Sequence, residues 1–171
     1  MIVKTKYYSK SIGLYDAYLF ISTLKHDNTQ DEELKKLYHL QIEDAERLIS
    51  SGYQPMITIG YIQPKILYKI ESLKDNLKLY EKNSLGEIVK KMELGDYLQM
   101  KIDLGLMILK HAIRGHIDFF DHDGQEIPFK VDSDNLVHDE ILGMYEYQSF
   151  MVYLPDYVLY FQTLSPEEKK S

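Results

Sequence analysis

Histidine and aspartate are the side chains of this sequence best suited to chemistry, and they gather in its second half. His111 and His116 lie five residues apart, and Asp118, His122 and Asp123 follow them. Imidazole and carboxylate together suit zinc, manganese or iron. However, two histidines that bind one ion from a helix are normally four residues apart. We therefore expect surface or helix-end histidines here, and we assign no metal ligand, cofactor-binding residue or catalytic residue.

Residues 121–124 (D-H-D-G) have the composition of a calcium loop but not its spacing. If Gly124 is the sixth loop residue, Phe119 stands first, where Asp is needed, and Lys130 stands twelfth, where Glu is needed. The sequence also has no cysteine, no phosphate-binding glycine loop and no G-x-S-x-G motif. Because no grouping for nucleophilic catalysis is left, we expect a protein that is not an enzyme.

Composition and charge narrow the possible partners. The 171 residues include 27 acidic and 20 basic side chains, for a net charge of −7, and 44% are hydrophobic. Nucleic-acid binding depends on a basic surface, so we expect neither nucleic acid nor an anionic membrane as partner. No apolar stretch approaches the roughly 20 residues that span a membrane. We expect one α+β domain, mostly helical, over residues 1–164, followed by a charged tail at 165–171.

Apolar periodicity predicts the helices. Residues 29–51 give the clearest pattern, with Thr29 and Glu32 forming a capping box at the start. A second capping box, formed by Ser84 and Glu87, precedes an apolar stripe and predicts another helix. Further helices are expected at residues 12–24, 65–82, 97–113 and from Leu154-Pro155 onward.

Short strands and one hairpin complete the predicted elements. The segments 2–9 and 56–62 have the composition of strands. Residues 117–129 predict a β-hairpin, because the dipeptide Asp123-Gly124 suits the two positive φ angles of a type I′ turn.

The chain contains fifteen tyrosines and no tryptophan. Tyrosine is enriched at protein interfaces, which favours a binding surface. An AT-rich coding genome, which also favours Lys, Ile and Asn, explains the same count, and both interpretations stay open. The tyrosines that cluster towards the two ends are Tyr7, Tyr8, Tyr145, Tyr147, Tyr153, Tyr157 and Tyr160.

One stretch resembles small proteins encoded among the virion and tail-assembly genes of tailed phages. It comprises Gly105-Leu106, Arg114-Gly115 and the run D-F-F-D-H-D-G-Q-E-I-P-F at residues 118–129. Those proteins show a D-x-D-G-x-x-I-P-F hairpin, then Leu-Pro and a short closing helix before an acidic tail. The resemblance covers residues 55–168, and His116 stands where the family usually carries Trp.

The resemblance implies a virion structural or assembly protein, such as a head–tail connector, a tail component or a tail-assembly chaperone. Its partners would be other virion or assembly proteins, or a second copy of the chain, met through the Tyr-rich ends and the hairpin. Its location would be the host cytoplasm during assembly and then the virion. The alternative is a small metal-dependent enzyme or host-defence antagonist that uses His111, His116 and Asp118.

Overall fold

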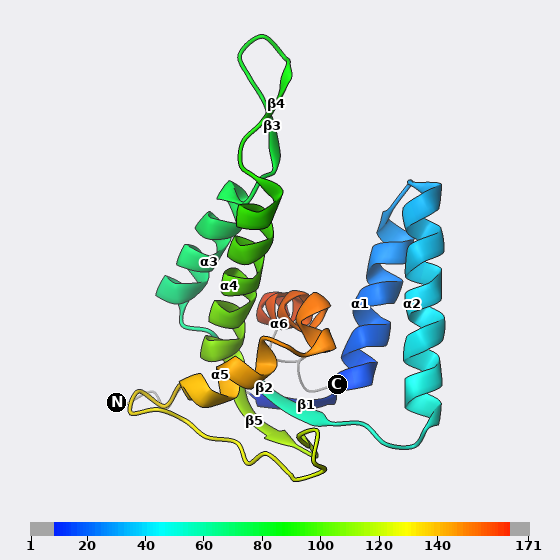
Figure 1. The fold of residues 1–171 in the computed structure, drawn as a ribbon, viewed down its shortest axis with the longest axis vertical. Helices are drawn as coiled ribbons and strands as arrows, with labels where there is room; N and C mark the ends of the chain where they lie inside the picture. Colours follow the sequence, from blue (N-terminus) through cyan, green and yellow to red (C-terminus); the bar gives the residue numbers. More distant parts are fainter. Residues whose placement is uncertain (1–8, 165–171) are drawn as a thin grey trace.

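In the computed structural model, which describes residues 9–164, two helical hairpins rise from a small antiparallel sheet (Figure 1). The sheet has the order β1-β2-β5, with β1 at Ser9–Gly13, β2 at Met56–Gly60 and β5 at Ile113–Ile117. The first hairpin joins α1 (Leu14–Asn28) to α2 (Glu32–Ser50), and the second joins α3 (Pro64–Asn76) to α4 (Leu94–Ala112). The second hairpin ends in a two-stranded ribbon, β3 (Tyr80–Lys82) and β4 (Ile88–Lys90). The remaining helices are α5 (Asp139–Tyr145), a 3-10 turn (Ser149–Val152) and α6 (Leu154–Thr163).

The hydrophobic core lies where the hairpins meet the sheet. Helix α6 lies between the two hairpins and packs against α1 and α4 (Figure 1). The predicted α+β class, dominated by helix, is confirmed. No helix within residues 9–164 is long and apolar enough to cross a bilayer. The largest fully buried apolar side chains are Tyr145, Phe150, Phe161, Ile57, Ile59, Ile70, Leu109, Ile113, Leu154, Val137 and Val158.

A glycine sets the distance between α4 and α6. A Cβ at Gly105 would lie 3.0 Å from Cε of Met151 and 3.3 Å from Cγ of Pro155. Glycine therefore lets the backbone of α4 approach the start of α6 closely.

The start of α1 differs from the prediction. The helix begins at Leu14 rather than at residue 12, because Ile12 and Gly13 belong to β1. Gly13 offers no capping side chain, and the amide of Gln54 takes that role from a distant part of the chain. Its Oε1 accepts hydrogen bonds from the backbone N–H groups of Tyr15 (3.1 Å) and Asp16 (3.2 Å). The predicted strand at 2–9 lies outside the described residues, apart from Ser9.

The helix predicted at residues 29–51 exists, but its cap is not Thr29. Asp31 precedes the first turn of α2, and its Oδ1 accepts from the backbone N–H of Glu33 (2.9 Å) and of Leu34 (3.2 Å). Thr29 instead accepts a hydrogen bond from the N–H of Asp31 through its hydroxyl (3.2 Å). Both residues are good caps, and the position at which the backbone turns helical decides between them.

The helix predicted from Ser84 and Glu87 is wrong, and the helix predicted at 65–82 ends early, at Asn76. The chain between them forms the ribbon β3–β4. Asn83 holds its turn, because Oδ1 accepts from the N–H groups of Leu85 (2.9 Å) and Glu87 (3.0 Å). Gly86 supplies the required positive φ of 76°. Glu87 therefore belongs to a hairpin turn rather than to a helix cap.

The hairpin predicted at 117–129 has its turn in the right place but of another type. Gly124 has a φ of 77° and donates its N–H to the carbonyl of Asp121 (3.0 Å), while Asp123 is not in the positive φ region. This is a three-residue loop with a bulge rather than a type I′ turn. A single bridge, between Phe120 and Glu126, replaces the expected strands.

Candidate protein-binding site

The second hairpin extends well beyond the core. We call residues 64–112, which comprise α3, β3, β4 and α4, the arm (Figure 1). Ile70, Ile108 and Leu109 are buried and anchor the lower part of the arm in the core. From residue 71 to residue 104, no residue is buried. Apart from Leu104, which packs against the core at the lower end of this range, the upper arm contributes little to the hydrophobic core, so the fold does not require its apolar side chains.

Apolar side chains nevertheless cover the upper arm. The ribbon exposes Leu85 (80% exposed) and Ile88 (71% exposed) at its tip. Scattered surface leucines are normal, but a contiguous apolar group on a projecting element is typical of a binding surface. Nine of the twenty exposed large apolar residues of the described chain lie on the arm: Tyr68, Leu73, Tyr80, Leu85, Ile88, Val89, Leu94, Leu98 and Met100.

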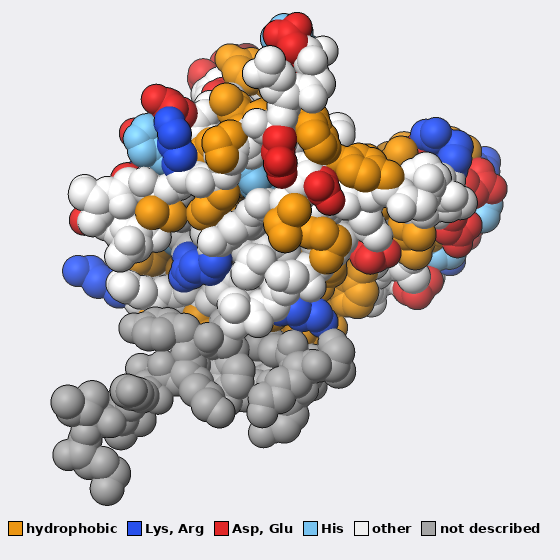
Figure 2. All heavy atoms as spheres, turned by 90° about the horizontal axis from the view of Figure 1, so that it is seen from below, with side chains coloured by type: hydrophobic (Ala, Val, Ile, Leu, Met, Phe, Trp, Pro, Cys, Tyr) orange, Lys and Arg blue, Asp and Glu red, His pale blue; other side chains and the backbone are white. Residues whose placement is uncertain are grey.

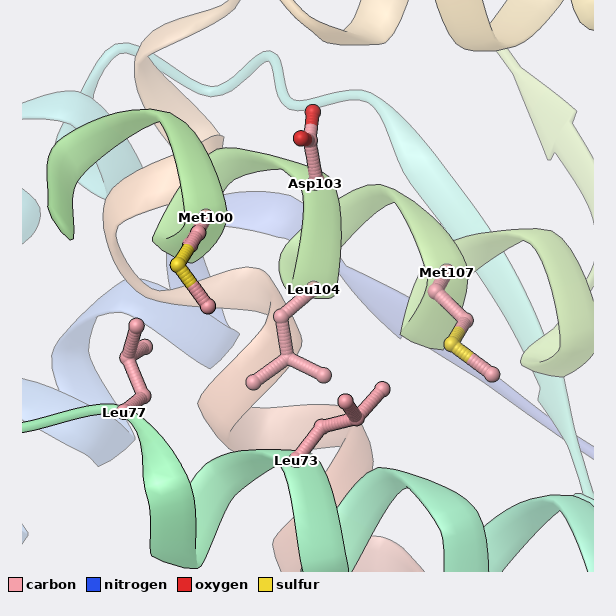
Figure 3. Close-up of a pocket in the computed structure, with 6 residues that line it drawn as sticks. All are labelled: Leu73, Leu77, Met100, Asp103, Leu104 and Met107. Carbon is pink, nitrogen blue, oxygen red and sulfur yellow. The ribbon is translucent and has the colours of Figure 1, made fainter. Parts of the chain in front are cut away.

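A groove of about 200 Å³ runs between α3 and α4 on the arm (Figure 3). Leu73, Leu77, Met100, Leu104 and Met107 line it, and Asp103 stands at its edge. The Asp103 carboxylate is directed away from the apolar side chains in Figure 3 and accepts a hydrogen bond from Nε2 of Gln99 (2.9 Å). The two methionines give the groove an adaptable surface. It can hold an apolar side chain.

Two ion pairs join residues within and next to the ribbon. Lys91 pairs with Glu81 at 3.0 Å, and Lys90 pairs with Glu93 at 2.7 Å. The hydrogen bond and charge of Lys91 lower the pKa of Glu81. These pairs are exposed, so each contributes little to stability.

A second pocket, of about 370 Å³, lies between the two hairpins with α6 as its floor. Lys25 of α1 pairs with Asp156 of α6 across it at 3.0 Å, and Glu71 and Lys74 come from α3. Because the charged groups are of both signs and exposed, this pocket has no strong preference for a ligand charge.

His116 is held by two hydrogen bonds and is not free to bind an ion. Nδ1 lies 2.7 Å from the hydroxyl of Tyr145, and Nε2 lies 2.7 Å from the carbonyl oxygen of Ile127. The ring stacks on Phe119 with centroids 4.5 Å apart and meets Phe129 edge-on. Burial lowers the pKa of His116. The imidazole thus packs as one ring of an aromatic cluster with Phe119, Phe129 and Tyr145.

The other residues of the metal alternative do not join His116. His111 faces a basic environment on α4, and burial, then Lys110 and Arg114, lower its pKa. Asp118 adopts a positive φ of 63°, and its carbonyl accepts the hydroxyl of Tyr53. Within residues 9–164, no three His, Asp or Glu side chains are grouped so that they could hold a metal ion.

His122 and Asp123 belong to the exposed turn. Nε2 of His122 lies 3.5 Å from a carboxylate oxygen of Asp123, and both side chains are open to solvent. His116 cannot join them as a metal ligand, because both of its ring nitrogens already form hydrogen bonds, with Tyr145 and with Ile127.

The tyrosines towards the C-terminus are mostly core residues. Tyr145, Tyr153 and Tyr157 are at most 7% exposed, and burial raises the pKa of each. Tyr153 stacks on Tyr18 with ring centroids 4.6 Å apart. The interpretation of these three as interface residues is therefore wrong, because their rings are needed inside. Tyr147 is 85% exposed, and Tyr7 and Tyr8 lie outside the described residues.

Sequence reasoning missed the arm as a site. Its signal was present in Leu85, Ile88 and Val89, but that stripe was assigned to an amphipathic helix. A search of family models, of curated proteins and of solved structures gives no match to this chain.

Proposed function

We propose that this chain is a virion structural or assembly protein of a tailed phage, which works by protein contacts and binds its partner through the arm. The observation that carries the proposal is the stretch from residue 71 to residue 104, which contains no buried residue and yet exposes a series of large apolar ones. A segment that contributes so little to the core would be expected to be polar. Its apolar surface is explained if a partner covers it.

The shape of the arm supports binding by insertion. The ribbon projects beyond both helices, and its tip carries Leu85 with Ile88 nearby. An apolar tip of this kind fits a pocket on a partner, where buried anchors supply most of the binding free energy. The groove at Leu73 and Met107 offers a complementary surface for an apolar side chain of that partner.

The phage context comes from the resemblance that covers residues 55–168. In that context the partners are other virion or assembly proteins, met in the host cytoplasm during assembly and then in the virion. The net charge of −7 favours protein partners over nucleic acid.

Binding to the products of the neighbouring virion genes tests the proposal. Each product is co-expressed with the full chain, and affinity is measured by biolayer interferometry for the wild type and for Leu85→Ser with Ile88→Thr. The double variant is expected to bind about 30-fold or more weakly, as for two hot-spot residues. Its fold should be unchanged, since neither side chain is buried.

The matched control replaces equally exposed apolar residues elsewhere, with Tyr147→Ser and Val152→Ser (85% and 67% exposed). This control is expected to bind as the wild type does. The proposal is wrong if no neighbouring virion product binds, or if the ribbon variant binds as tightly as the control.

A further inference from the structure

The charge of the molecule is concentrated at one end. Residues 118–140 contain eight carboxylates and one lysine, a net charge of −7, which equals that of the whole chain. This segment lies beneath the sheet, at the opposite end of the long axis from the ribbon (Figure 1). We call it the base. The rest of the chain is close to neutral, so a positively charged partner is attracted to the base first.

The base is also apolar in part. Phe120 and Val131 are each nearly half exposed, and Ile117 at the end of β5 is more than half exposed. The view from below shows apolar side chains and carboxylates interspersed on this face (Figure 2). A fitting partner therefore combines apolar side chains with positive charge.

The arm of this same chain has that combination. Residues 64–112 contain nine lysines against seven carboxylates. Lys78 and Lys82 stand beside the exposed Tyr80 on the ribbon, and neither forms an ion pair with another residue of 9–164. Residues 78–91, which contain the ribbon, hold four lysines against two glutamates, so the end that exposes Leu85 carries a small net positive charge.

We propose that the ribbon of one copy docks on the base of a second copy, so that the protein assembles head to tail. This inference rests on the proposed function, because it names a second copy as a partner of the arm. The two surfaces differ and lie at opposite ends, so the contact is heterologous and each docked copy leaves a free end for the next. Assembly therefore proceeds beyond a dimer, into a ring if the rotation between copies closes and into an open filament if it does not.

Cross-linking between introduced cysteines tests where the two copies touch. The chain has no cysteine of its own, so each variant carries a single reactive thiol. One copy carries Leu85→Cys, the other carries Asp123→Cys, and a short bismaleimide links cysteines that come close. A cross-linked dimer is expected in the mixture. The control pair joins Leu85→Cys to Leu40→Cys, a residue of similar exposure on α2, and should give little product. Equal yields from the two pairs would overturn the proposal.

Charge exchange tests the electrostatics by sedimentation velocity. The wild type is expected to show concentration-dependent species larger than a dimer at low salt, which weaken at 0.5 M salt. A ribbon variant (Lys78→Glu with Lys82→Glu) and a base variant (Asp123→Lys with Glu126→Lys) should each associate at least about tenfold more weakly. Mixing the two variants should restore association, because each then meets an opposite charge.

The outcomes separate this inference from the proposed function. If the wild type stays monomeric at 100 µM and low salt, the head-to-tail contact is overturned, while binding of a neighbouring virion product still stands. The head-to-tail contact is likewise overturned, and the proposed function still stands, if replacing Asp123 and Glu126 weakens binding of that virion product but does not weaken association between copies of this chain. If mixing the two variants restores nothing, the ribbon and the base are not each other's partners.

Discussion

The hydroxyl of Tyr145 lies 2.7 Å from Nδ1 of His116 and joins α5 to β5. The carbonyl of Ile127, 2.7 Å from Nε2, can only accept, so Nε2 carries the proton. Nδ1 is then the acceptor for the tyrosine hydroxyl. Both nitrogens of a neutral imidazole are satisfied, and a proton added at Nδ1 would leave the hydroxyl of Tyr145 without its acceptor.

Acidification should therefore destabilise the protein. Burial lowers the pKa of His116 and of His111 below the ordinary value of 6.5. Between that value and the native pKa, the unfolded chain binds protons that the native protein excludes, so the free energy of unfolding falls as the pH falls. Urea unfolding at pH 7.5, 6.5 and 5.5 should give a decreasing midpoint.

The glutamine variants identify the groups responsible. His116→Gln and His111→Gln should each flatten the pH dependence between pH 7.5 and 5.5, and the double variant should remove most of it. A slope that both variants leave unchanged would mean that other groups control it. Above pH 7, where both states are neutral at these positions, no pH effect of the two histidines is expected.

Gln54 should stabilise α1 across the chain. Replacing Gln54 by Ala removes the acceptor for the N–H groups of Tyr15 and Asp16, and should lower the free energy of unfolding by about 1 kcal/mol, as for the loss of a cap. In Gly13→Ala, the new Cβ would lie 2.2 Å from Oε1 of Gln54 and displace the same amide.

The two changes should not be additive, because they remove one interaction. Gly13→Ala is expected to destabilise the wild type but to have little effect in the Gln54→Ala background. Equal effects in both backgrounds, measured by urea unfolding, would show that the alanine clashes with something other than Gln54.

Replacing Ser22 by alanine should stabilise the protein. Its side chain is fully buried in α1, and its Oγ has no hydrogen-bond partner among the described residues. Ser22→Ala removes this unsatisfied group and should raise the free energy of unfolding by about 1 kcal/mol. The control is Ser50→Ala at the exposed end of α2, which should change stability little. A less stable Ser22→Ala would reveal a partner for this hydroxyl.

Three turns have the same side-chain-to-backbone hydrogen bonds, but replacing the accepting residue by alanine should affect stability differently from one turn to another. Asn83, Asp121 and Asp132 each accept, through Oδ1, from the backbone N–H groups two and four residues ahead. Asp132 is close to the fully buried Val137, whereas Asn83 belongs to the ribbon. Asp132→Ala should lower the urea midpoint, and Asp132→Asn, which keeps Oδ1, should restore it.

Asn83→Ala should leave the urea midpoint unchanged, because no core residue depends on the ribbon. Its effect should appear as faster hydrogen exchange confined to residues 80–90. Loss of global stability in Asn83→Ala would show that the ribbon packs on the core.

Local chemistry accounts for the parts of the fold that the sequence predicted. The stripes of α2, α3 and α4, the strand at Met56 and the turn at Gly124 all follow from neighbours within a few residues. The predictions of helix caps and hairpins were wrong where two local conformations were close in energy. Thr29 and Asp31, for example, are both good caps for the same helix. At residues 84–92 the periodicity of a helix competed with the turn preference of Asn83 and Gly86, and the turn was preferred.

The sequence alone therefore determined a helix-dominated α+β chain with an acidic segment and no visible catalytic grouping. Only the tertiary structure decided that Tyr145 is buried against His116, 29 residues away, and that the apolar stripe of the ribbon stays uncovered. The reason is physical: burial depends on which distant surfaces meet, and periodicity shows that a face is apolar without showing what covers it.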